Sequence, residues 1–203
     1  MPVAEPVYAK VKRVIDLVLL AFLLPVAAPV GLICAVAVAV QSPGPVLFSQ
    51  VRTGRHGSTF RMYKFRTMVQ NAEELKLSLQ HLNVLPFPDF KIIDDPRITP
   101  VGRFLRASSL DELPQLWNIL RGDMSFVGPR PTSFATTSYD LWHTCRLEVR
   151  PGLTGLWQIR GRGSTTFDER LRLDVEYIRT MSPWTDLKIL FLTAGSVVRR
   201  VGT

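Results

Sequence analysis

Two adjacent carboxylates, Asp111 and Glu112, are the residues of this chain best suited to carry out chemistry. They lie within the stretch Ser108–Pro114, and basic residues precede and follow them closely in the sequence. Carboxylate oxygens are preferred ligands of Mg²⁺, and arginine side chains match the oxygens of phosphate. The pattern therefore indicates chemistry on an anionic, metal-bound phosphate.

The acidic pair has a structural interpretation and a catalytic one. Pro114 is tolerated in the first turn of a helix, so we predict a helix that begins near Asp111. An acid at that position can simply cap the helix. A helix N-terminus would also keep Asp111 ionised and attract phosphate, so that the carboxylate could attack a phosphoryl group and form an acyl-phosphate. Glu112 is then predicted to help hold a metal.

Basic residues gather around predicted turns and are candidates for binding phosphate. Arg130 lies between Pro129 and Pro131, which fix its backbone, and Arg150 opens the similar turn Arg150–Gly155. Arginine forks match phosphate oxygens bidentately, whereas a solvated basic surface beside anionic lipid headgroups is the alternative. The predicted phosphate-binding set is Lys64, Arg66, Arg106, Arg130, Arg150 and Arg162.

The composition narrows the possible partners and cofactors. The chain has 203 residues, 46% of them hydrophobic, and a net charge of +8, which favours an anionic partner such as a phosphorylated small molecule, a lipid headgroup or nucleic acid. It contains no phosphate-binding loop and no dinucleotide-binding glycine motif. The three histidines are scattered, and Cys34 and Cys145 form no ligand pattern. A bound metal is therefore expected to be a hard cation, with Mg²⁺ as the default.

An apolar run of 24 residues without a charge extends from Leu17 to Val40 and is long enough to cross a bilayer. Pro25 and Pro29 interrupt it, and each favours a bend. Basic residues flank the run on both sides, so a straight span would place one basic cluster on the wrong side of the membrane. A kinked transmembrane anchor and a re-entrant helix that returns to the cytoplasm both fit this pattern.

The remaining elements follow from periodicity and turn residues. We predict strands over 46–51 and 59–65, helices over 71–84, 100–107 and 113–120, and a loop over 85–90. A capping box at Thr166 predicts a helix with Phe167, Leu171, Val175 and Ile178 on one face. A helix over 184–201 has an apolar side that fits a membrane surface or a core. The expected fold is α+β and mainly helical, with a membrane-inserted segment over 1–45 and a catalytic domain over 46–203.

Four motifs, in this order, resemble those of the bacterial sugar transferases, the monotopic polyprenyl-phosphate phosphoglycosyl transferases. The motifs are Tyr63–Met68, Ser109–Gln115, Gly122–Pro131 and Arg150–Gly155, and the similarity runs from Lys12 nearly to the C-terminus. The chain is similar to the minimal catalytic form of the family. The resemblance implies a re-entrant N-terminal membrane helix, a small β-hairpin and interfacial amphipathic helices around a compact catalytic core.

The resemblance also implies a reaction. Family members move a phospho-sugar from a nucleoside diphosphate sugar, most often a UDP-sugar, to undecaprenyl phosphate and release the nucleoside monophosphate, as the first membrane step of surface glycan synthesis. It implies that Asp111 is the nucleophile of a ping-pong mechanism, that Glu112 works beside it near Mg²⁺, and that Ala28–Pro29 is the break in the membrane helix. The expected location is the bacterial inner membrane, with the catalytic domain on the cytoplasmic face.

Two features depart from the family pattern. The family often has Asn-Gly-Arg where this chain has Arg160-Gly161-Arg162, and the segment 71–98 is longer than in the smallest members. Three other readings stay open: a sequential transferase without a covalent intermediate, an inactive membrane scaffold, and a membrane-tethered nucleic-acid binder. The last lacks a recognition-helix pattern, so no nucleic-acid partner is expected. The motifs specify neither the sugar, the nucleotide nor the oligomeric state.

Overall fold

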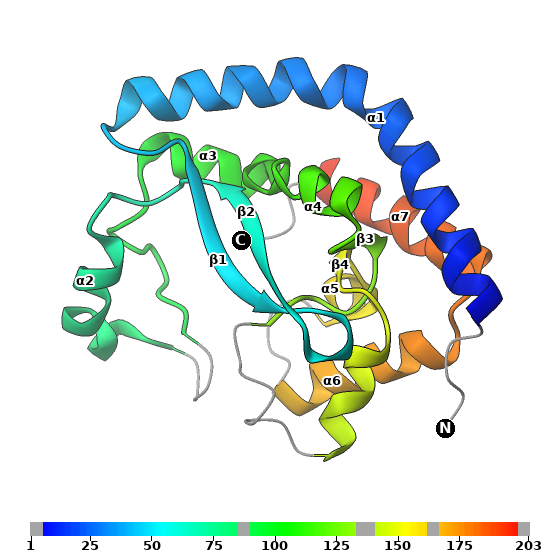
Figure 1. The fold of residues 1–203 in the computed structure, drawn as a ribbon. Helices are drawn as coiled ribbons and strands as arrows, with labels where there is room; N and C mark the ends of the chain where they lie inside the picture. The colour runs from blue at the N-terminus through cyan, green and yellow to red at the C-terminus, as the bar shows by residue number, and fades with distance from the viewer. Residues whose placement is uncertain (1–5, 85–89, 133–140, 162–166, 199–203) are drawn as a thin grey trace.

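The computed structural model of the chain describes residues 6–84, 90–132, 141–161 and 167–198. It is mainly helical with two small sheets (Figure 1), as the α+β prediction requires. The helices are α1 (Pro6–Gln41), α2 (Ala72–Ser78), α3 (Pro100–Ser108), α4 (Gln115–Arg121), α5 (Leu156–Arg160), α6 (Phe167–Arg179) and α7 (Pro183–Val198). The strands are β1 (Leu47–Thr53), β2 (Thr59–Phe65), β3 (Ser125–Val127) and β4 (Gly152–Thr154).

Helix α1 is a single helix of 36 residues that continues through Pro25 and Pro29. Figure 1 shows that it bends partway along, as proline in a helix interior explains. Among the described residues it is the one helix long and apolar enough to cross a membrane. Many of its large side chains, such as Phe22 and Ile33, lie exposed on the surface of the protein.

One face of α1 packs into the rest of the chain along both of its arms. Leu20 joins the larger hydrophobic cluster, which includes Ile119 and Met124. Cys34 and Val38, four residues apart and so on the same face, join a second cluster with Phe65 and Leu105. The Gln41 side chain also accepts a hydrogen bond from the Val101 N–H at 3.0 Å. Both ends of α1 are therefore attached to the same domain.

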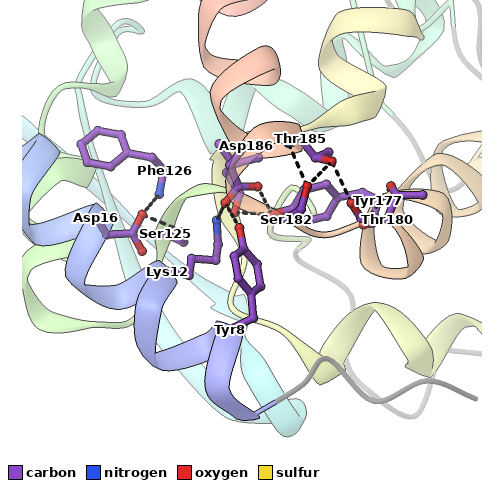
Figure 2. A network of polar contacts seen from close by, with 11 residues as sticks. Tyr8, Lys12, Asp16, Ser125, Phe126, Tyr177, Thr180, Ser182, Thr185 and Asp186 are labelled. Carbon is purple, nitrogen blue, oxygen red and sulfur yellow. Dashed lines mark hydrogen bonds and ion pairs between the residues drawn. The ribbon is translucent and has the colours of Figure 1, made fainter.

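A buried polar network fastens the N-terminal arm of α1 (Figure 2). Tyr8 and Lys12, one turn apart on α1, both donate to the Asp186 carboxylate at the start of α7, and Tyr177 of α6 donates to it at 2.7 Å. On the next turn, Asp16 accepts hydrogen bonds from the Ser125 hydroxyl at 2.9 Å and from the Phe126 N–H. The network therefore ties α1 to β3, α6 and α7.

This network changes the interpretation of the basic residues before the apolar run. Lys12 is buried and paired with Asp186, and the Arg13 guanidinium donates to the carbonyls of Ile119 and Leu120 at the end of α4. Lysine and arginine near a helix C-terminus satisfy its last carbonyls. Of the three basic residues that precede the apolar run, Lys10, Lys12 and Arg13, the last two therefore face the protein, and the charge argument for membrane topology keeps only Lys10 on this side.

The predicted hairpin is confirmed: β1 and β2 pair antiparallel, with Leu47 opposite Phe65 and Thr53 opposite Thr59. A short 3₁₀ turn, Arg55–Gly57, connects them. Met62 and Phe65 lie on opposite faces of β2 and are both buried, and Lys64, on the same face as Met62, reaches the acidic pair described below. The hairpin thus delivers one of the predicted basic residues to the site.

The second sheet joins two of the motifs. β3 and β4 pair in parallel, with Ser125 opposite Gly152 and Val127 opposite Thr154. A Cβ at Gly128 would overlap the carbonyl of Arg150 and the backbone of Gly152, so the two turns can approach this closely only with glycine. The sheet therefore fixes the turn that carries Arg130.

The helix predictions are partly right. Helix α3 begins at Pro100, as expected, with the Thr99 side chain as its cap. The helix predicted over 71–84 is wrong in its extent, because α2 ends at Ser78 and a separate 3₁₀ turn covers Gln80–Leu82. The loop predicted over 85–90 lies mostly outside the described residues, as does Thr166, the predicted cap of α6.

The two C-terminal helices differ in which faces they bury. Helix α6 buries Leu171 and Ile178, as predicted, but Asp174 and Tyr177 complete the face rather than Val175. Helix α7 buries Asp186 and Ile189 and exposes the predicted apolar side, with Leu187 at 56% and Phe191 at 79% exposure. Most of that apolar side therefore faces away from the core, although Leu190 packs against the larger hydrophobic cluster.

Candidate active site

The acidic pair lies on a 3₁₀ turn, Leu110–Glu112, between α3 and α4. The prediction that a helix begins near Asp111 is wrong, because α4 begins at Gln115. Pro114 has no N–H to donate to the Leu110 carbonyl, and the Leu113 N–H bonds that carbonyl instead at 3.2 Å. Ser109, in the left-handed region with φ 59°, turns the chain out of α3. The turn therefore presents both carboxylates between two helices.

Glu112 is held by two cations from different elements. Its Oε1 atom accepts from the Lys64 ammonium on β2 at 2.6 Å and from the Arg130 guanidinium at 3.0 Å. These contacts join the hairpin motif, the acidic motif and the proline-flanked turn at one carboxylate. Charge-assisted hydrogen bonds of this kind are stronger than neutral ones and fix the orientation of Glu112.

Asp111 is buried but only weakly paired. The nearest cation, the Lys64 ammonium, lies 3.6 Å from its Oδ2 atom. Burial raises the pKa of Asp111 above its ordinary value, and the charge of Glu112 also raises it, against the opposing charges of Lys64, Arg106 and Arg130. We expected a helix N-terminus to keep this carboxylate ionised. In the structure, three nearby cations favour its ionised form instead.

The environments of the two carboxylates separate their pKa values. Burial alone would raise the pKa of Glu112, but Arg130 and Lys64 outweigh it and lower that pKa to about 2. Glu112 is thus a permanent anion at neutral pH, whereas Asp111 is the more basic and less engaged group. Adjacent acids with divergent pKa values are the arrangement by which active sites assign different roles to the same functional group.

Arg106 also lies within electrostatic reach of Asp111, since its positive charge lowers the pKa of that carboxyl. Its Nε atom donates to the Thr67 hydroxyl at 2.8 Å, and its terminal nitrogens have no hydrogen bond to any residue that the structure describes. A Cβ at Gly102 would overlap the Thr67 carbonyl, so the close approach of α3 to this strand end depends on that glycine. Arg106 is therefore a positively charged side chain that Thr67 holds in position near the acidic pair.

The structure does not bring every predicted basic residue to the carboxylates. Arg66 donates to the carbonyls of Ser42 and Pro43, both at 2.6 Å, and so braces the connection between α1 and β1. Burial and the charges of Arg13 and Arg55 lower the pKa of Arg150. Within the described ranges, neither arginine forms an ion pair with Asp111 or Glu112. Arg162 lies outside the described residues.

Three supporting residues were not predicted. Asn118, fully buried, accepts from the Tyr63 N–H at 3.2 Å and donates to the Arg61 carbonyl at 2.7 Å, which locks α4 to β2. Arg146 and Asp174 form a buried ion pair at 2.7 Å behind Arg130. A polar residue between apolar neighbours, as in Trp-Asn-Ile, is the one sequence signal that could have identified Asn118.

The donor set at the acidic pair fits a hard divalent cation that is completed by substrate. Lys64 and Arg130 both bond Oε1 of Glu112, which leaves Oε2 and both Asp111 oxygens without a hydrogen bond from any described residue. No cluster of three or more potential ligands occurs in the part of the chain that the structure describes. Mg²⁺ is typically held by one or two carboxylates together with substrate phosphates, which matches this arrangement.

Comparison with known proteins gives a consistent result. The sequence matches the family described as bacterial sugar transferase over residues 7–200. It is 42% identical over 200 residues to the undecaprenyl-phosphate galactose phosphotransferase of Salmonella typhimurium (94% of this chain, 41% of the relative). It is 43% identical over 199 residues to the UDP-glucose:undecaprenyl-phosphate glucose-1-phosphate transferase of Caulobacter vibrioides (92% and 69%).

A third relative, the galactosyl transferase CpsE of Streptococcus agalactiae, is 50% identical over 161 residues, which are 78% of this chain and 36% of the relative. The chain thus spans 36% and 41% of the length of two of these three proteins. The relatives align with most of this chain, including the region that contains the acidic pair and the cations around it.

Proposed function

The chain belongs to the bacterial sugar transferase family, and we propose that it transfers a phospho-sugar from a nucleoside diphosphate sugar to undecaprenyl phosphate. The observation that carries this proposal is the buried, weakly paired Asp111 beside a Glu112 anchored by Lys64 and Arg130. The names of two relatives, which include undecaprenyl phosphate and a sugar or sugar phosphate, support the substrate class. If the chain follows the reaction of its family, the products are a polyprenyl diphosphate-sugar and a nucleoside monophosphate.

The proposed chemistry has two steps. An Asp111 oxygen attacks the phosphorus that carries the sugar, the bond from that phosphorus to the bridging oxygen breaks, and the nucleoside monophosphate leaves with the electron pair. An oxygen of undecaprenyl phosphate then attacks the same phosphorus and releases the Asp111 carboxylate. A raised pKa makes Asp111 a better nucleophile than an exposed aspartate, provided that the nearby cations keep it ionised.

The surrounding cations would compensate the charge of two anionic substrates. Among the described residues, no side chain or carbonyl bonds the terminal nitrogens of Arg106, which lies within electrostatic reach of Asp111, and Lys64 contacts both carboxylates. Phosphoryl transfer depends mainly on positioning and on neutralising charge, which fixed cations supply. Bound Mg²⁺, held by Asp111 and Glu112, would supply further neutralisation of the diphosphate.

We further propose that α1 enters one leaflet and returns, so that the catalytic domain lies on the cytoplasmic face of the inner membrane. The support is structural: the N-terminal arm is tied to Asp186 through Lys12, and the C-terminal arm packs Val38 into the second hydrophobic cluster of the same domain. These contacts with one domain support a topology in which both ends of the helix lie on the same side of the membrane. Pro25 and Pro29, with Ala28 preceding the second proline, account for the bend.

The deciding experiment is intact-mass analysis of the protein incubated with UDP-sugars and Mg²⁺ in the absence of lipid. We expect an adduct with the mass of a phospho-sugar, mapped to Asp111, and none in the Asp111→Asn variant. Glu74→Gln on α2, an exposed acid, is the matched control and should form the adduct normally. Nucleoside monophosphate release that requires lipid and leaves no adduct would favour the sequential mechanism, whereas no release with any nucleotide sugar would favour the scaffold.

A further inference from the structure

The turn Arg150–Gly155 carries an arginine for which the proposed reaction has no use. The cations that shift the pKa values of the acidic pair come from β2, α3 and the turn of Arg130, and Arg150 is not one of them. Its guanidinium is half-buried, and in the part of the chain that the structure describes it has neither a hydrogen bond nor an ion pair. A charge that is partly removed from water is costly unless it is paired. Arg150 therefore lacks the partner that its surroundings call for.

Two further arginines approach Arg150 from other elements. Arg55, in the turn of the β-hairpin, donates from its Nε atom to the Glu148 carbonyl at 3.0 Å, two residues before Arg150. Arg13 of α1 donates to the last carbonyls of α4. The charges of both lower the pKa of Arg150, so the three guanidiniums lie within electrostatic reach of one another. Within the described ranges, backbone carbonyls and not carboxylates hold Arg13 and Arg55, and their positive charge is therefore not cancelled.

The backbone around β3 holds these arginines together. The Ser125 N–H donates to the Pro151 carbonyl at 2.9 Å, and the Ser125 hydroxyl donates to Asp16, about one turn after Arg13 on α1 (Figure 2). Among the described residues, Asp16 is the one acid whose charge shifts the pKa of Arg150, and its carboxylate already accepts two hydrogen bonds from β3. One carboxylate against three guanidiniums leaves a net positive charge. Like charges held close together are unfavourable unless an anion joins them.

We propose that Arg13, Arg55 and Arg150 form a second phosphate-binding site, separate from the acidic pair and beyond the proposed reaction. Guanidinium groups match the oxygens of phosphate in geometry and in charge. All three side chains are half-buried, so a ligand can reach them from the surface while part of its charge is shielded from water. The ligand is a phosphate group, which a soluble phosphorylated molecule and an anionic phospholipid both carry.

An anion at Arg150 would also steady the turn that carries Arg130. The Gly152 N–H donates to the Pro129 carbonyl at 2.9 Å, and a Cβ at Gly128 would overlap the Arg150 carbonyl, so the two turns form one backbone unit. We expect inorganic phosphate to slow the hydrogen exchange of the Gly128 and Gly152 amides in the wild-type chain and to have little effect on it in Arg150→Gln. Equal slowing in both proteins would place the phosphate at the cations of the acidic pair and overturn the proposal.

The site itself is tested by protection of arginines from phenylglyoxal, measured residue by residue by peptide mass analysis of the full chain in detergent. We expect millimolar inorganic phosphate to slow the modification of Arg150 about threefold or more, relative to sodium chloride of the same ionic strength. Arg172 on α6, an exposed arginine, is the matched control and should react at the same rate in both salts. Equal protection by sodium chloride, or equal protection of Arg172, would mean that only screening or unspecific binding occurs and would overturn the proposal.

Two further arms identify the contributing residues and the source of the phosphate. Arg55→Gln should raise the phosphate concentration for half-protection of Arg150 about tenfold, because one charged donor is lost. If Arg55→Gln does not fold, the exchange measurement on Arg150→Gln decides instead. Protection by phosphatidylglycerol vesicles but not by phosphatidylcholine vesicles or inorganic phosphate would assign the site to a lipid headgroup, and protection by inorganic phosphate alone would assign it to a soluble ligand. No protection in any arm would refute the site. Since no nucleotide sugar is present, the result is independent of the proposed reaction.

Discussion

Arg146 donates a hydrogen bond from its guanidinium to the backbone carbonyl of Arg130 at 2.6 Å. The same Nη2 nitrogen lies 2.7 Å from the Asp174 carboxylate on α6. Arg130 in turn holds Glu112. A chain of contacts thus connects the interior of α6 with the acidic pair, although neither Arg146 nor Asp174 touches the carboxylates.

The contact between Arg146 and Arg130 predicts a positioning role. Arg146→Met should lower kcat about 10- to 100-fold, because the turn that carries Arg130 loses its fixed backbone and a small misplacement of a catalytic group is costly. Arg146→Lys, which can still reach one of the two partners, should recover part of the loss. Steady-state kinetics with both substrates check this. A variant with wild-type kcat would show that Pro129 and Pro131 alone are sufficient to hold Arg130.

The two carboxylates should respond oppositely to neutralisation. Burial raises the pKa of Asp111, so its charge costs stability, and Asp111→Asn should raise Tm by about 2–4 °C while abolishing turnover. Glu112→Gln should lower Tm by a similar amount, because Lys64 and Arg130 lose their common partner. Thermal unfolding in detergent measures both variants. Equal shifts of the same sign would contradict the division of roles between the two acids.

Asp174 predicts a pH dependence of stability. Burial is the main cause that raises the pKa of Asp174 from 3.8 to about 6, against the opposing charge of Arg146. A raised pKa in the folded state means that the protonated form favours folding, so this contribution is complete below about pH 4 and is lost as pH rises through 6. The Tm of Asp174→Asn, which cannot titrate, should lack this decline. Parallel wild-type and variant profiles between pH 4 and 7 would exclude the effect.

Chelation should stop the reaction. Asp111, Glu112 and a diphosphate are all anionic. Lys64 and Arg130 already pair with Glu112, so Arg106 alone brings too little positive charge to neutralise the diphosphate. We expect excess EDTA to lower turnover about 100-fold or more and Mg²⁺ to restore it. Zn²⁺ should restore less, because the site offers oxygen ligands only. Full activity in excess chelator would refute the magnesium assignment.

The re-entrant topology can be tested by labelling. With Cys34 and Cys145 replaced by serine, single cysteines at Lys10 and Pro45 should react with a membrane-impermeant maleimide from the same side of inverted vesicles. Pro29→Leu restores a backbone donor inside the helix and should shift part of the protein toward a full span. Labelling of the two cysteines from opposite faces would overturn the model of a helix that returns.

Local patterns predicted the hairpin and the acidic pair because both depend on neighbouring residues: β1 and β2 on a turn between two apolar strands, and Asp111 and Glu112 on adjacency. The predicted helix start near Asp111 was wrong because that prediction placed Pro114 within the first helical turn, whereas α4 begins only after this proline, at Gln115.

Longer-range roles could not be predicted from local pattern. Arg66 and Arg106 carry the same guanidinium, yet one bonds carbonyls 23 and 24 residues away and the other lies beside Asp111. Which partner an arginine meets is decided by the packing of α1 and α3, and no spacing in the sequence encodes it. The role of Arg146 could not be predicted for the same reason, because its partners lie in another turn and another helix.

The network around Asp186 has a consequence for the order of assembly. Tyr8 and Lys12 bond a carboxylate that lies 178 and 174 residues further along the chain. Because a polypeptide is synthesised from its N-terminus, α1 leaves the ribosome long before Asp186, the residue that Tyr8 and Lys12 bond, has been synthesised. If α1 meets lipid first, the rest of the domain must fold beneath an already inserted helix, and α7 is the last of the described helices to join it. Chains released before residue 186 would then remain attached to the membrane without a completed fold, a class of product that quality-control proteases would have to remove.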